Sequence, residues 1–147
     1  MNDLVTADER PLTIFLVDDD DIDAKELERA FRKGKIGNTL VRAVDGIEAL
    51  EMLKGTNGRT KPPSPHILLV DLNMPRMNGI ELVHALREDE ELHRSVVFIL
   101  TTSKRDEDKM AAYNLHVAGY IAKATAEEDI RNLVSLMDSY GRIVELP

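Results

Sequence analysis

Cysteine is absent from the 147-residue sequence, and long hydrophobic runs are absent as well. Without cysteine the chain can form no disulfide framework and offers no thiolate ligand to a metal. The longest uninterrupted apolar runs, residues 67–70 and 96–100, are far too short to cross a bilayer. The first eleven residues contain no apolar stretch of the kind that a signal peptide requires. We therefore expect a cytoplasmic protein that does not enter a membrane.

Positive charge is scarce relative to negative charge. The chain has 19 Lys and Arg residues against 27 Asp and Glu residues, a net charge of −8. Because an acidic protein repels the phosphates of nucleic acids, we expect no direct nucleic-acid partner. Hydrophobic residues at 43% and charged residues at 31% are typical of a globular domain, and the length fits one domain.

Short apolar runs alternate along the chain with apolar residues at helical spacing. Continuous apolar runs predict strands that are buried on both faces, here residues 13–17, 40–44, 66–70, 96–100 and 118–122. The helical stripes are Ala24, Leu27, Ala30 and Phe31; Ile47, Leu50 and Leu53; Ile80, Val83 and Leu86; Met110, Ala111 and Leu115; and Ile130, Leu133, Val134 and Met137. Five such alternations predict an α/β fold, a doubly wound five-stranded parallel sheet with helices on both faces.

Local signals support these helix boundaries. Four pairs of residues with capping-box spacing precede helical stripes: Asp45–Glu48, Asn78–Glu81, Ser103–Asp106 and Thr125–Glu128. Gly141 follows the last stripe and is expected to end that helix. We expect an N-terminal tail over residues 1–12, one domain over 13–141 and a C-terminal extension over 142–147.

Polar residues follow four of the predicted strands. Asp18 and Asp19 follow the first strand, Asp71 the third, Thr101 the fourth and Lys123 the fifth. In an open parallel sheet, ligands bind beyond the carboxyl ends of the strands. In the flavodoxin-like strand order 2-1-3-4-5 the first and third strands are neighbours, so the three aspartates are expected to meet there.

Three carboxylates in one place repel each other, and a hard divalent cation relieves that repulsion. Oxygen ligands of this kind suit Mg²⁺, which keeps several of its waters. A carboxylate can also act as a nucleophile and form an aspartyl phosphate. The metal and a lysine would neutralise the charge on the transferring group, and a threonine hydroxyl could donate a hydrogen bond to it.

Four segments together resemble the receiver domains of two-component signalling: FLVDD (15–19), LLVDLNMPRMNG (68–79), FILTTS (98–103) and GYIAK (119–123). The resemblance extends from about residue 13 to residue 140. It implies a phosphoacceptor, Asp71, with Mg²⁺ held by Asp18, Asp19, Asp71 and the backbone carbonyl of Asn73. It also implies a switch hydroxyl on Thr101, a phosphoryl-binding Lys123 and a switch aromatic, Tyr120.

Within that family the chain is most similar to small regulators that partner bacterial phytochromes. The similarity lies in the LTTS run, in YNLHVAGYIAK (113–123), in the long loop before the third strand and in the short tail. It implies a single-domain regulator that receives phosphate from a sensor histidine kinase of the phytochrome type. Such a regulator is not an enzyme beyond slow autodephosphorylation. It would signal by docking to a target or by onward phosphorelay to a phosphotransfer protein.

The C-terminal extension is apolar, with Ile143, Val144 and Leu146. Exposed apolar residues can mark an interface, so we expect a homodimer that uses the extension and the last helix. The alternative is that the extension folds back on its own domain or frays.

One residue departs from the family pattern. Most receivers have a cis proline after the lysine, whereas here Ala124 follows Lys123. Because a cis bond before a non-proline residue costs roughly 2.5–4 kcal/mol, we expect a trans bond at this position.

Two other functions remain open. A haloacid-dehalogenase-like phosphatase also uses an aspartate nucleophile with Mg²⁺, and Asp18 and Asp20 have the one-residue gap of that family, although Ile22 does not fit it. The second is an interaction module that keeps the fold without taking phosphate.

Three of the acids after the first strand have a simpler interpretation. Asp20, Asp21 and Asp23 are expected only to favour the positive end of the following helix.

Overall fold

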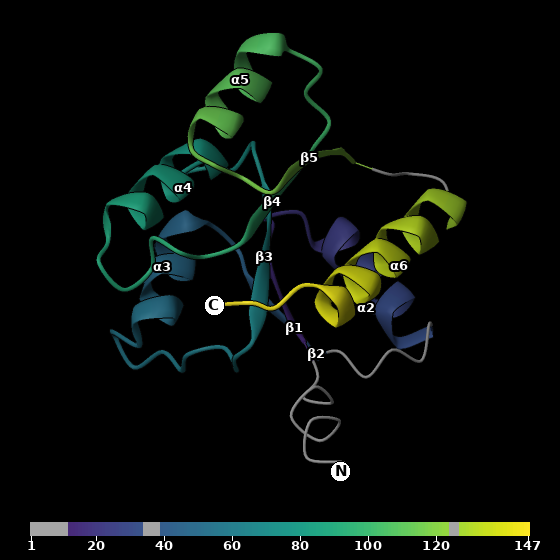
Figure 1. Ribbon diagram of the computed structural model, residues 1–147, viewed down its shortest axis with the longest axis horizontal. Helices are drawn as coiled ribbons and strands as arrows, with labels where there is room; N and C mark the ends of the chain where they lie inside the picture. The colour runs from purple at the N-terminus through teal and green to yellow at the C-terminus, as the bar shows by residue number, and fades with distance from the viewer. Residues whose placement is uncertain (1–11, 34–38, 124–126) are drawn as a thin grey trace.

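The computed structural model describes residues 12–33, 39–123 and 127–147, in which five strands alternate with five helices (Figure 1). The elements are β1 (Thr13–Val17), α2 (Asp21–Lys33), β2 (Thr39–Ala43), α3 (Gly46–Lys54), β3 (His66–Asp71), α4 (Gly79–Glu88), β4 (Val97–Thr101), α5 (Asp106–Asn114), β5 (Gly119–Ala122) and α6 (Glu127–Ile143). None of the helices in the described segments is long and apolar enough to cross a membrane.

All five strands pair in parallel, in the order β2-β1-β3-β4-β5. This order confirms the predicted flavodoxin-like sheet. The observed strands differ from the predicted ones by one residue at some ends. In particular, β3 includes Asp71 and β4 includes Thr101, so both strands end in the polar residue that was expected at the end of each.

Helices cover both faces of the sheet, and the central strands β1, β3 and β4 are buried as their continuous apolar runs predict. The prediction is wrong for the edge strands β2 and β5, which are only partly buried. Successive side chains of a strand point to opposite faces. Ile14 and Leu16 of β1 belong to the core cluster formed with α2 and α6, whereas Phe15 and Val17 belong to the cluster formed with α3 and α4. Figure 1 shows the corresponding layers, with α3, α4 and α5 on one side of the sheet and α2 and α6 on the other.

Two of the four predicted capping pairs start helices in the structure. Asn78 and Glu81 form a reciprocal capping box at the start of α4, and the side chain of Asp45 accepts a hydrogen bond from the Glu48 N–H at the start of α3. The Ser103–Asp106 prediction is wrong. Helix α5 starts at Asp106 without a side-chain cap, and the Ser103 hydroxyl instead donates to Asp108 Oδ2 at 2.6 Å. Thr125 lies outside the described residues.

Helices α5 and α6 differ from their predicted forms. In α5 the buried residue is Ala112, while Met110 is 64% exposed and Leu115 follows the helix. Helix α6 continues through Gly141 to Ile143, so the glycine does not end it. Gly141 instead allows close packing, because a Cβ there would lie 2.6 Å from a methyl carbon of Leu12.

The side chain of Arg87 ties the end of α4 to two loops. Its guanidinium donates to the carbonyl oxygens of His93 (2.8 Å) and Ser95 (2.7 Å) in the loop before β4. It also donates to those of Leu115 (2.7 Å) and His116 (3.0 Å) in the turn between α5 and β5. His116 has a positive φ of 61°, a conformation that costs free energy in a non-glycine residue. Arg87 therefore supports a strained turn that sets where α5 ends.

We expect Arg87→Met to lower the free energy of unfolding by about 2–4 kcal/mol, because partly buried carbonyl groups lose a charged donor. Arg94→Met, at an exposed position of the loop before β4, is the matched control and should change it by less than about 0.5 kcal/mol. Urea denaturation measures both values. Equal stability of the two variants would contradict a structural role for Arg87.

Candidate functional site

The candidate site lies at the carboxyl end of the sheet. Asp18 directly follows β1, Asp71 and Thr101 end β3 and β4, and Lys123 directly follows β5. The backbone N–H of Lys123 donates to the Thr101 carbonyl at 2.7 Å, so pairing between β4 and β5 extends to the lysine. The parallel sheet thus brings together side chains that are up to 105 positions apart in the sequence, from Asp18 to Lys123.

Asp18, Asp19 and Asp71 form a cluster in which one carboxylate oxygen of each lies within 4.8 Å of the others. Asp18 is fully buried and Asp71 is 6% exposed, whereas Asp19 is exposed. The Asp18 Oδ1 accepts a hydrogen bond from the Asp20 N–H, but the buried Oδ2 of the same carboxylate accepts none. An oxygen-only donor set fits a hard divalent cation such as Mg²⁺, and the buried Oδ2 of Asp18 has only the Lys123 ammonium, at 3.3 Å, to balance its charge.

Burial strongly influences the acidity of the cluster. Burial raises the pKa of Asp71 to about 6; the charge of Lys123 acts in the opposite direction and that of Asp18 in the same direction. Burial also raises the pKa of Asp18, against the Asp20 N–H and the Lys123 charge. Both shifts show that the negative charge of these carboxylates is poorly balanced without a further cation.

Lys123 supplies positive charge to the site. Its ammonium nitrogen lies 3.4 Å from Asp71 Oδ2 and 3.3 Å from Asp18 Oδ2. Burial opposes its charge, but the hydrogen bond to Asp23 and the charges of the surrounding aspartates outweigh burial and raise the pKa of the ammonium. Ala124 lies outside the described residues, so the predicted trans bond after Lys123 remains a prediction.

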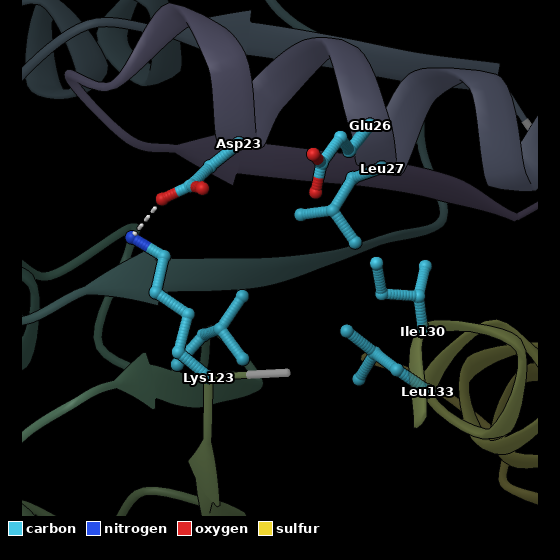
Figure 2. A pocket seen from close by; sticks show the side chains of 7 residues that line it. Asp23, Glu26, Leu27, Lys123, Ile130 and Leu133 are labelled. Carbon is cyan, nitrogen blue, oxygen red and sulfur yellow. Dashed lines mark ion pairs between the residues drawn. The ribbon is translucent and has the colours of Figure 1, made fainter. Parts of the chain in front are cut away.

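Asp23 is a neighbour of Lys123 that the sequence argument missed. Its Oδ2 lies 2.7 Å from the lysine nitrogen, closer than either Asp18 or Asp71 (Figure 2). One signal could have found it. Asp23 precedes the buried Leu27 by four residues, so both side chains lie on the same face of α2, which packs against the sheet.

Thr101 and Tyr120 lie on the α5 side of the site. Thr101 is 1% exposed, and its Oγ1 accepts a hydrogen bond from the Ser103 N–H at 3.0 Å. Tyr120, on β5, is half-buried, and its hydroxyl donates to the Ser103 carbonyl at 3.4 Å. Both residues therefore contact the same short segment between β4 and α5.

The loop between β3 and α4 keeps the backbone of Asp71 in place. Asn73 is exposed, and its N–H lies 3.4 Å from Asp71 Oδ1. The Gly79 N–H donates to the Leu72 carbonyl at 2.9 Å. A Cβ at Gly79 would lie 2.5 Å from the Asp71 carbonyl oxygen, a distance at which atoms clash. Glycine is therefore required where α4 starts beside the end of β3.

Two arginines that the sequence argument did not single out hold the loops around the cluster. Arg42 donates from Nε and Nη2 to the carbonyl oxygen of Asp18, at 3.0 and 2.9 Å. Arg76, which has a positive φ of 64°, donates from Nε to the buried Asp45 carboxylate at 2.8 Å. These contacts join residues 24 and 31 positions apart, a separation at which no periodicity in the sequence can reveal a pair.

Asp20, the second acid of the phosphatase alternative, is engaged elsewhere. Its Oδ1 accepts hydrogen bonds from the N–H groups of Ile22 and Asp23, the arrangement of a residue that caps a helix. The structure therefore uses Asp20 to start α2, as the simpler interpretation of that acid predicts.

Replacement of Asp71 by asparagine is expected to stabilise the metal-free protein near neutral pH by about 1–3 kcal/mol. The reason is that the folded state binds the Asp71 proton more tightly than the unfolded state, with a pKa of about 6 against 3.8. As the pH falls through 6 towards 3.8, the parent gains stability and the difference between the two proteins should shrink. Urea denaturation in EDTA at several pH values measures the free energy of unfolding of both proteins. A difference between them that does not change with pH would contradict the raised pKa of Asp71.

Comparison with known proteins finds response regulators that are similar to most of this chain. Response regulator Rcp1 of Synechocystis is 30% identical over 130 residues, which are 88% of each chain. The crystal structure of its Mn²⁺-bound form matches with a TM-score of 0.79 at 29% identity, over 93% of this chain and 99% of that one. The phosphorylated cyanobacterial phytochrome response regulator RcpA matches with a TM-score of 0.82 at 28% identity, over 94% and 99%. The bacteriophytochrome response regulator AtBRR matches with a TM-score of 0.72 at 27% identity, over 94% and 98%.

The sequence pattern of one family accounts for most of the chain. The response regulator receiver domain matches residues 14–135, a range that includes every predicted site residue and all of the sheet except Thr13. Receiver domains are phosphoacceptor signalling modules rather than classical enzymes. The chain belongs to the response regulator receiver domain family, and in sequence and structure it is close to the phytochrome response regulators.

Proposed function

We propose that the protein is a single-domain response regulator in which Asp71 accepts a phosphoryl group from a histidine kinase. The observation that carries this proposal is the position of Asp71, at the end of β3 between the acidic pair Asp18 and Asp19 and the ammonium of Lys123. Its relatives support the chemistry, since RcpA has been crystallised in a phosphorylated form and Rcp1 with Mn²⁺.

In the proposed reaction a carboxylate oxygen of Asp71 attacks the phosphorus of a phosphohistidine. The new P–O bond forms as the P–N bond breaks, and the histidine nitrogen keeps the electron pair. Lys123 and the hydroxyl of Thr101 bind the transferred oxygens. Asp18, Asp19, Asp71 and the carbonyl of Asn73 would hold Mg²⁺, whose charge would stabilise the transition state. Water then hydrolyses the acyl phosphate slowly.

The proposed switch follows from where the new charge arrives. Phosphorylation takes the local charge from about −1 towards −2. The Thr101 side chain would turn to donate its hydroxyl to the new oxygens, and this rotation would move Oγ1 away from the Ser103 N–H that it now accepts from. The segment from Ser103 to α5, together with Tyr120, is then free to rearrange. Helix α5 buries only Ala112 among its described residues, so little packing opposes its movement.

The kinase is proposed to be of the phytochrome type, because the phytochrome response regulator RcpA and the bacteriophytochrome response regulator AtBRR are similar over 94% of this chain. The receiver domain is proposed to span residues 13–141, with a tail at 1–12 and an extension at 142–147. The phosphorylated protein would act in the cytoplasm by docking to a target or by passing the phosphoryl group on to a phosphotransfer protein.

The direct test is intact mass after incubation with Mg²⁺ and a small phosphodonor such as acetyl phosphate. We expect one labile phosphoryl group on the parent and none on Asp71→Asn, because the amide is not a nucleophile. EDTA should abolish the adduct if a divalent cation is required. Asp20→Asn, which changes an acid that caps α2, is the matched control and should still take the group.

Absence of an adduct with both a small donor and a phytochrome-type histidine kinase would favour the interaction module that never takes phosphate. Repeated turnover of a phosphomonoester would favour the phosphatase. Each outcome therefore identifies one of the three functions.

A homodimer is proposed through α6 and the C-terminal extension. Ile143 is 80% exposed and Leu136 is 44% exposed, and both lie on one side of α6 by helical spacing. Leu146, in contrast, packs against the core of its own chain. The available apolar surface is therefore on the helix and its last turn rather than at the end of the tail.

We expect light scattering to give twice the chain mass for the parent and the mass of one chain for Ile143→Asp, because a buried unpaired charge opposes association. Asn114→Asp adds the same charge to an exposed residue of α5, on the opposite face of the sheet from α6, and should remain dimeric. A monomeric parent, or an unchanged mass for Ile143→Asp, would exclude this interface.

A further inference from the structure

The ammonium of Lys123 is shared among three aspartates, and the nearest of them is not part of the acidic cluster. The distances from the lysine nitrogen are 2.7 Å to Asp23, 3.3 Å to Asp18 and 3.4 Å to Asp71. The side chain of Lys123 is 13% exposed and that of Asp23 is 34% exposed. In the resting protein the lysine therefore lies closest to α2 rather than to the proposed phosphoacceptor.

Apolar side chains surround the Lys123–Asp23 pair. A pocket between α2 and α6 is lined by both members of the pair, by Glu26 and by the apolar residues Leu27, Leu100, Ile130 and Leu133. Figure 2 shows Asp23 pointing from α2 towards the lysine, with the leucine and isoleucine side chains deeper between the two helices. Because the apolar residues exclude part of the solvent while Asp23 stays 34% exposed, we expect this pair to have the strength of a partly screened ion pair.

The backbone of Lys123 is fixed while its side chain has a choice of partners. The N–H to the Thr101 carbonyl holds the backbone at the end of the sheet. The ammonium has three N–H donors, and three carboxylates surround it. A phosphoryl group on Asp71 would bring further oxygens, so an ammonium that turns towards them must weaken its contact with Asp23.

We propose that Asp23 is a positioning residue that holds the Lys123 ammonium towards α2 in the resting protein and competes for it with the phosphoryl group. This inference rests on the proposed phosphoacceptor function of Asp71. It assigns to Asp23 a role in setting how readily the site takes up and keeps a phosphoryl group. A purely structural role, as an acid in the first turn of α2, would leave the phosphoryl site unchanged.

The competition can be measured with beryllofluoride, a phosphoryl mimic, in the presence of Mg²⁺. Binding is followed by the amide NMR signals of Thr101 and Lys123. Asp23→Asn should lower the half-saturating concentration by about five-fold, the effect of losing a competing ion pair worth about 1 kcal/mol. Asp23→Glu keeps the carboxylate and should restore a value closer to that of the parent.

Glu26→Gln is the matched control. Glu26 is exposed one turn further along α2 and lines the same pocket, but it makes no ion pair with Lys123 among the described contacts. Its replacement by glutamine therefore removes the same charge without removing a partner of the lysine. It should bind beryllofluoride as the parent does. Equal or weaker binding by Asp23→Asn, or an equal gain in Glu26→Gln, would overturn the proposal.

A second measurement separates failure of this inference from failure of the proposed function. The NMR signal of the Lys123 ammonium, recorded without beryllofluoride, should shift in Asp23→Asn and stay in place in Glu26→Gln. An unmoved signal in Asp23→Asn overturns the holding role of Asp23. A parent that binds no beryllofluoride and takes no phosphoryl group overturns the phosphoacceptor function and the competition with it, whereas a shifted ammonium signal would still support the holding role.

Discussion

The contact between the Lys123 ammonium and the buried carboxylates of Asp18 and Asp71 is the interaction on which the site depends. Two carboxylates with 0% and 6% exposure would be costly to bury together without a cation beside them. The lysine reaches them from the edge strand of the order β2-β1-β3-β4-β5, because pairing between β4 and β5 continues to the Lys123 N–H, which donates to the Thr101 carbonyl. Strand order, rather than any local motif, therefore assembles opposite charges from the two ends of the sequence.

Backbone contacts make one side of this site rigid and leave the other side free to move. Arg42 holds the carbonyl of Asp18, and the close approach of Gly79 fixes the carbonyl of Asp71. On the other side, α5 begins without a side-chain cap and buries little, while Arg87 anchors the turn at its far end. A change at Thr101 would thus meet least resistance at the start of α5, which makes this helix a suitable element for transmitting the state of Asp71.

The sequence predicted the parts of the fold that local chemistry determines. Uninterrupted apolar runs predicted buried parallel strands, and polar residues at their ends predicted Asp18, Asp71, Thr101 and Lys123 as neighbours. Prediction from the sequence failed where the local signals are weak or where the contacting residues are distant in the sequence. Helix α5 has almost no apolar face, so Met110 was wrongly expected to pack, and Ser103 was taken for a cap although its hydroxyl bonds to Asp108. The partners of Arg42, Arg87 and Asp23 are brought to them only by the tertiary fold. In a run of acids at the start of a helix, the sequence does not indicate which acid points towards the sheet.

The balance of charge explains why the site would respond to phosphorylation. Together, the three clustered aspartates, Asp23 and Lys123 carry three net negative charges when all four carboxylates are ionised, and one divalent cation neutralises two of them. A phosphoryl group adds a further negative charge that a bound cation would no longer balance. The nearest remaining positive charge is the lysine, which in the resting protein lies closest to Asp23. Moving that ammonium from Asp23 to the new oxygens therefore contributes to the difference in free energy between the resting and the phosphorylated protein. This contribution depends on a residue of α2 that lies outside the acidic cluster.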